Sequence, residues 1–140
     1  MNPPVFPLHF TLAFWCVLVA ALLPLLCAFF AKSNLLAGPG DASYDNNEPR
    51  IWFARQSGAR SRANAAQTNS FEGLPFFIGA VIVAHLLGAP QWPLDLLAVA
   101  YIVLRLVFIA AYISGHSSLR SVAWVLGLVA NLAILLMGYR

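Results

Sequence analysis

The chain has 140 residues, of which 61% are hydrophobic and only 9% are charged, and its mean hydropathy is +0.78. Soluble domains carry about a quarter charged residues, so this composition excludes an ordinary soluble protein and favours one membrane domain. The net charge of +3 comes from scattered basic residues rather than a Lys/Arg run, which argues against nucleic-acid binding.

Residues 8–31 form the first apolar segment, long enough to cross a hydrocarbon core as a helix of about 20 residues. Because it lacks a basic N-terminal region and a small-residue cleavage site, we expect a retained helix rather than a signal peptide. Its two cysteines, Cys16 and Cys27, lie about three turns apart, too far to form a disulfide with each other. They match no metal-ligand spacing, so no metal is expected.

Residues 32–57 form the long polar connection. Its stretch 41–50 is rich in acidic and amide side chains, but it lacks the alternating ligands and central glycine of an EF-hand calcium loop. We therefore expect a solvated loop there. The apolar residues 51–53 that follow indicate an approach to the membrane interface.

Three more spans are expected, at residues 58–87, 93–114 and 119–138, joined by short turns. The sequence shows no internal repeat. The chain is thus predicted to be an all-α, multi-pass integral membrane protein, a four-transmembrane-helix bundle that forms a single domain over residues 1–140.

Basic residues indicate the orientation of this bundle. An excess of Lys and Arg marks cytoplasmic connections, so the first and third connections are predicted to be cytoplasmic and both termini lie on the other side. The second connection has no basic residue, and the C-terminus has only Arg140. The basic residues in these two predicted cytoplasmic connections or at the adjoining ends of the spans are Lys32, Arg50, Arg55, Arg60, Arg62 and Arg120.

The second span begins with a polar face. At helical spacing Arg62, Asn69 and Glu72 point the same way, because seven residues make about two turns and three make nearly one. An ionisable residue within a span is costly unless it faces protein or a water-filled cavity. This face is therefore the candidate functional site.

The third span carries a matching stripe. Arg105, Phe108 and Tyr112 recur every three or four residues along it. Arg105 and Glu72 fall at a similar membrane depth, so we expect them to form a buried ion pair. Such a pair either supports a ligand site or only fixes the register of the helices.

Together these residues resemble the MAPEG family, the membrane-associated proteins of eicosanoid and glutathione metabolism. The resemblance covers nearly the whole chain, including its length, its four helices and its long first connection, and it points to a bacterial-type member. The residues that carry it are, in chain order, Arg62, Asn69, Glu72, Pro75, Arg105, Tyr112, Arg120 and Ser121.

The resemblance implies a homotrimer that binds glutathione as a co-substrate between neighbouring subunits, near the cytoplasmic face. It implies a hydrophobic small-molecule substrate delivered by the membrane lipids, and a location in the bacterial inner membrane with the site facing the cytoplasm. The glutathione-binding residues would be Arg62, Asn69, Glu72, Arg105 and Tyr112.

The catalytic residues implied by the resemblance are Arg120, which would stabilise the thiolate, and Ser121, which would assist by a hydrogen bond. A thiol is a poor nucleophile until it is deprotonated, and a guanidinium that never loses its charge favours the thiolate. Arg120 also falls in the first turn of the fourth helix, where the helix dipole favours an anion.

The sequence departs from the family pattern at two positions on the second span. The eicosanoid-type enzymes usually have an arginine where this chain has Ala65 and often a tyrosine where it has Gly73. Arg62, one turn earlier, and Lys32, at the end of the first helix, are the alternative cations for a glutathione carboxylate.

Three functions remain open from the sequence. The first is a glutathione-dependent transferase or peroxidase that acts on hydrophobic electrophiles or lipid hydroperoxides. The second is a non-catalytic binder of lipids or partner proteins with the same fold, which the alanine at position 65 favours. The third is a small transport or channel subunit, which the intramembrane charge alone suggests and the absence of repeats disfavours.

Overall fold

The computed structural model describes residues 10–139; the predicted helix start at residue 8 and the C-terminal Arg140 lie outside this range. The described chain contains four long helices: α1 (Leu12–Lys32), α3 (Gly58–Leu86), α4 (Gln91–Ser114) and α5 (Ser117–Leu136). Each is long and apolar enough to span a membrane, which confirms the predicted all-α, four-helix membrane architecture.

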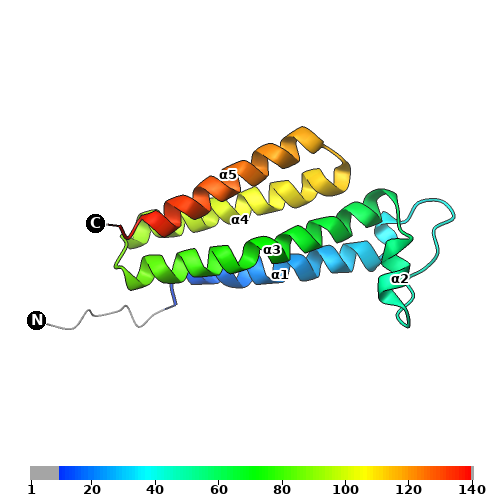
Figure 1. Ribbon diagram of the computed structural model, residues 1–140, viewed down its shortest axis with the longest axis horizontal. Helices are drawn as coiled ribbons and strands as arrows, with labels where there is room; N and C mark the ends of the chain where they lie inside the picture. The colour runs from blue at the N-terminus through cyan, green and yellow to red at the C-terminus, as the bar shows by residue number, and fades with distance from the viewer. Residues whose placement is uncertain (1–9, 140) are drawn as a thin grey trace, which may run out of the picture.

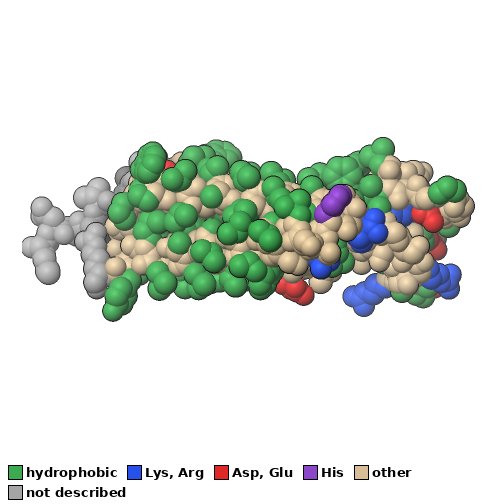
Figure 2. Space-filling model, turned by 90° about the horizontal axis from the view of Figure 1, so that it is seen from above, with side chains coloured by type: hydrophobic (Ala, Val, Ile, Leu, Met, Phe, Trp, Pro, Cys, Tyr) green, Lys and Arg blue, Asp and Glu red, His purple; other side chains and the backbone are tan. Residues whose placement is uncertain are grey.

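The four helices run antiparallel in two pairs, with α1 packed on α3 and α4 packed on α5 (Figure 1). The long connection and the turn between α4 and α5 lie at one end of the bundle, and the start of α1 and the end of α5 lie at the other end. We call the first of these ends the loop end. Charged side chains gather toward it, while the surface along the helices is mostly apolar (Figure 2).

Small residues allow the first pair of helices to approach closely. Ala13 and Ala20 on α1, and Ala80 and Ala84 on α3, are buried in the core between the helices. Such residues bring helix backbones together in membranes, where dispersion replaces the hydrophobic effect as the main attraction. At the end opposite the loop end, the Asp95 carboxylate of α4 accepts a hydrogen bond from the first turn of α1 at 2.8 Å.

The long connection contains structure that the sequence analysis did not predict. It has a short 3-10 helix, η1 (Asn34–Leu36), and a short α-helix, α2 (Pro49–Ala54), that begins with a proline suited to a first helical position. Trp52 of α2 is buried, and its indole N–H donates to the Ser43 carbonyl at 2.9 Å. Residues 51–53, expected at a membrane interface, are thus part of a folded cap on the loop end.

Arg60 holds this cap in place. Its side chain is 0% exposed, donates to the Ala42 carbonyl at 2.8 Å and to Asn34 Oδ1 at 2.9 Å, and lies over the Trp52 ring. The Ser33 carbonyl, at the end of α1, accepts a further hydrogen bond from the guanidinium at 3.3 Å. One arginine at the start of α3 therefore joins α1, η1 and the loop.

We predict that Arg60→Met loosens the cap, because three acceptors lose a charged donor in a buried place. Chymotrypsin cleavage within residues 41–56 should become at least about tenfold faster, since proteolysis follows the population of the open form. Arg55→Met, which removes an exposed arginine of the same segment, is the matched control. Equal cleavage rates in the two variants would contradict this role for Arg60.

Candidate functional site

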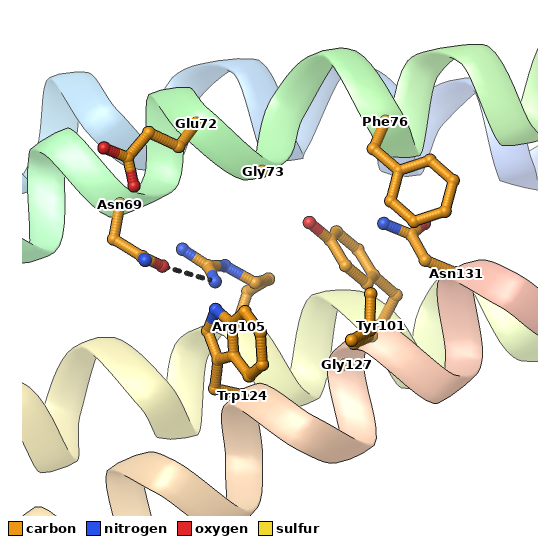
Figure 3. A pocket seen from close by; sticks show the side chains of 10 residues that line it. Asn69, Glu72, Gly73, Phe76, Tyr101, Arg105, Trp124, Gly127 and Asn131 are labelled. Atoms are coloured by element: carbon orange, nitrogen blue, oxygen red, sulfur yellow. Dashed lines mark hydrogen bonds between the residues drawn. The ribbon is translucent and has the colours of Figure 1, made fainter.

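A cavity of about 210 Å³ lies between α3, α4 and α5 (Figure 3). Three of the residues predicted for the site line it, and they come from two different helices: Asn69 and Glu72 from α3, and Arg105 from α4. The other residues that line the cavity are Gly73, Phe76, Tyr101, Trp124, Gly127, Leu128 and Asn131.

Arg105 is the buried charge of this cavity, with only 7% of its surface exposed. Its guanidinium donates to Asn69 Oδ1 at 3.1 Å and to Ser70 Oγ at 3.0 Å, and it lies 4.4 Å from the centre of the Phe108 ring. Ser70 in turn donates to the Ala66 carbonyl, which directs its oxygen lone pairs at Arg105. Neutral oxygens and an aromatic face thus surround a positive charge inside the bundle.

The predicted ion pair between Glu72 and Arg105 is wrong for the single chain. Within residues 10–139 neither residue has an ion-pair partner, and Glu72 is exposed at the edge of the cavity. The guanidinium of Arg105 is instead bonded to two neutral oxygens of α3, Asn69 Oδ1 and Ser70 Oγ. Glu72 lies on the same side of α3 as Asn69 and lines the same cavity, but its side chain stays exposed and forms no ion pair with Arg105.

A chain of rings and cations connects the cavity to the loop end. The guanidinium of Arg120 lies 4.6 Å from the centre of the Tyr112 ring, and the Tyr112 and Phe108 rings meet edge to face at 5.5 Å. Phe108 is the ring beneath Arg105. The structure therefore brings Tyr112 and Arg120 together, but beside the cavity rather than in its lining.

The remaining two predicted residues make other contacts. Arg62 Nε donates to the Ile113 carbonyl at 2.8 Å, so this side chain ties the start of α3 to the last turn of α4 instead of lining the cavity. Ser121 is exposed, and its hydroxyl donates to the Ser117 carbonyl at 3.0 Å within the first turn of α5.

Several residues of the cavity were not predicted from the sequence. Tyr101 lies one turn before Arg105 on the same face of α4, so extending the predicted stripe by one turn would have found it. Asn131, an amide within a hydrophobic span, was also a signal, because polar groups in a span need a partner. No group of three or more potential metal-ligating side chains lies together in the described part of the chain.

A comparison with protein-family models matches the MAPEG family to residues 12–139, nearly the whole chain. The chain belongs to the MAPEG family. This confirms the family resemblance and supports, at the level of the family, a membrane protein of glutathione or eicosanoid metabolism. Searches of curated proteins and of solved structures found no significant match to the chain.

The contacts of Arg105 predict a clear contrast between two charge-removing variants. Arg105→Leu leaves Asn69 and Ser70 without their donor, and each lost bond to a charged group costs about 1.5–3 kcal/mol. Glu72→Gln removes an exposed carboxylate that has no partner among the described residues, and it should leave stability nearly unchanged.

Thermal unfolding of the two detergent-purified variants measures this contrast. The expected result is a large fall in Tm for Arg105→Leu and a Tm close to the parent for Glu72→Gln. An equal fall in Tm in both variants would instead indicate that Arg105 and Glu72 interact with each other.

Proposed function

We propose that this MAPEG protein is a membrane-bound, glutathione-dependent transferase or peroxidase. It activates the thiol of glutathione as a thiolate, which attacks a hydrophobic electrophile or a lipid hydroperoxide. The observation that carries the proposal is that Arg105 and Arg120 follow one another along a face of the bundle, with no carboxylate paired to either among the described residues.

The charges on this face suit glutathione, which has two carboxylates, one ammonium group and a thiol. Arg105 and Arg120 offer positive charge to its anionic groups, and the exposed Glu72 carboxylate offers a partner to its ammonium group. Asn69, bonded to Arg105 through its oxygen, keeps its amide N–H groups for the peptide backbone.

The spacing of these residues also fits a tripeptide. Arg105 and Tyr112 are seven residues apart on α4, a rise of about 10 Å, and three extended residues also span about 10 Å. A tripeptide that lies along the face can therefore extend from Arg105 and Asn69 to Tyr112. The thiol of its central cysteine then lies between these ends, where the side chains of Tyr112 and Arg120 approach it from the loop end.

Arg120 is the residue proposed to stabilise the thiolate. A free thiol has a pKa of about 8.5, so most of it is protonated at neutral pH, and a fixed guanidinium charge shifts that balance toward the thiolate. Arg120 lies in the first turn of α5, where unpaired backbone N–H groups and the helix dipole add to the attraction. In the transferase reaction the thiol proton leaves to solvent, the sulfur bonds to the electrophilic carbon, and the bond from that carbon to its leaving group breaks, the group departing with the electron pair. In the peroxidase reaction the thiolate attacks the hydroperoxide and breaks its O–O bond, the lipid leaves as an alcohol, and a second glutathione displaces water from the resulting sulfenic acid to give the disulfide.

The family pattern supports a homotrimer in which a neighbouring subunit completes this site, with the loop end at the cytoplasmic face of a bacterial inner membrane. In that arrangement the electrophile arrives laterally from the lipid. The exposed position of Glu72 agrees with a site that a second subunit covers.

A non-catalytic binder of lipids or partner proteins is the second candidate. It is favoured by Ser121 and Arg62, whose polar groups bond to the Ser117 and Ile113 carbonyls instead of pointing at a bound thiol. The two candidates differ in whether the bound thiol becomes ionised.

The test is the ultraviolet absorbance of the thiolate after glutathione is added to the detergent-purified protein near neutral pH. The parent should show a thiolate signal and turn over a reactive aromatic electrophile. Arg120→Ala should bind glutathione but lose the thiolate signal and at least about a hundredfold in turnover, because it removes the charge that stabilises the anion.

Arg50→Ala, which removes an exposed arginine of α2, is the control and should retain both signals. Glutathione that binds without ionising in the parent would favour the non-catalytic candidate. Unchanged turnover in Arg120→Ala would exclude the proposed role of Arg120.

A further inference from the structure

Asn131 places an unsatisfied amide inside the membrane bundle. It lies in α5, well within the predicted span, with only 3% of its surface exposed, and its Oδ1 atom is buried without a hydrogen-bond partner. The amide nitrogen of Asn131, Nδ2, also makes no hydrogen bond to a described residue. Buried polar groups are nearly always paired, because an unpaired one costs the free energy of removing it from water.

Tyr101 presents a second unpaired polar group to the same end of the cavity. Its ring is 4% exposed and is fixed by stacking on Phe77 at 4.1 Å, while its hydroxyl makes no hydrogen bond within residues 10–139. The Tyr101 hydroxyl and the Asn131 amide both face the space beneath Gly73 and Phe76 (Figure 3). We call this space the deep end of the cavity.

Two glycines keep the deep end open. A Cβ atom at Gly73 would stand 3.4 Å from the Tyr101 hydroxyl oxygen, and one at Gly127 would stand 3.9 Å from the Tyr101 ring. A larger side chain at Gly73 would extend into this space. The glycine therefore leaves room for a ligand group beside the Tyr101 hydroxyl.

We propose that the deep end binds a neutral hydroxyl group carried by the hydrophobic substrate. The charged groups of the cavity, Arg105 and Glu72, lie at its other end, and Arg105 is held there by Asn69 and Ser70. A hydroxyl both donates and accepts, so it pairs with the Asn131 amide in either orientation of that amide and also with the Tyr101 hydroxyl. An ether or an alkane lacks the donor that the amide oxygen needs.

This hydroxyl is a recognition group and not the reacting group. Asn131 and Arg120 are eleven residues apart on α5, a separation of about 16 Å along the helix. The inference that the ligand is the substrate rests on the proposed function, and it describes a molecule with an apolar chain between an electrophilic centre and a remote hydroxyl. Binding at the deep end itself does not depend on glutathione.

The test compares two probes with the same number of heavy atoms, decanol and methyl nonyl ether. Binding of each is measured without glutathione by equilibrium dialysis against the protein in lipid nanodiscs, with empty nanodiscs subtracted. The parent should prefer decanol by about tenfold, because only the alcohol can donate a hydrogen bond. Asn131→Leu should abolish this preference.

Two further variants keep the test decisive. Tyr101→Phe retains the stacked ring and should reduce the preference for decanol, whereas Asn64→Leu changes an amide of α3 outside the cavity and should leave the preference intact.

Asn131→Leu should also unfold at a temperature no lower than the parent, because it removes an unpaired amide and not a bonded one. Equal binding of the two probes by the parent, or a full preference in Asn131→Leu, would overturn the proposal.

The experiment separates this inference from the proposed function. A preference for decanol without any glutathione-dependent thiolate signal would support the hydroxyl site in a protein that does not activate thiols. A thiolate signal without the preference would support the enzyme and reject the hydroxyl site.

Discussion

The site depends on the way Arg105 is held. A guanidinium inside a membrane bundle needs compensation, and here Asn69 Oδ1, Ser70 Oγ and the Phe108 ring supply it instead of a carboxylate. Neutral oxygens satisfy the donors but leave the positive charge in place. The result is a cavity lined by a buried, uncancelled positive charge, which favours an anionic ligand. The same contacts connect α3 to α4 and so help the cavity keep its shape.

Side chains of α4 and α5 form a continuous row of contacts toward the loop end. Arg105 and Tyr112 from α4 are linked through Phe108, and Arg120 from the first turn of α5 covers the Tyr112 ring. Antiparallel packing makes this possible, since the start of α3, the end of α4 and the start of α5 meet at the loop end (Figure 1). The lining of the cavity beyond Arg105 is apolar except for Tyr101 and Asn131, so a charged region and a mostly apolar region lie in sequence along the cavity.

The spans and the family were predictable from sequence, because apolar length sets the number of membrane helices and a few spaced polar residues carry the family pattern. The sequence did not predict equally well which side chains of a helix face a given neighbouring helix. Ser70 and Glu72 are both polar and close in depth, and only the packing of α3 on α4 decides which one faces Arg105. For the same reason, counting residues did not show that Arg62 and Arg60 bind backbone carbonyls at the loop end.

A thermal-shift titration of the detergent-purified protein with glutathione tests the central claim most directly, because a ligand that binds only the folded form raises its apparent stability. Parallel titrations use smaller thiols and a glutathione analogue whose carboxylates are esterified. They show whether binding depends on the anionic groups of glutathione. The account predicts a rise in Tm that increases with glutathione concentration and is lost with the esterified analogue. No shift with any of the thiols, or equal shifts with the charged and the esterified peptides, would contradict it.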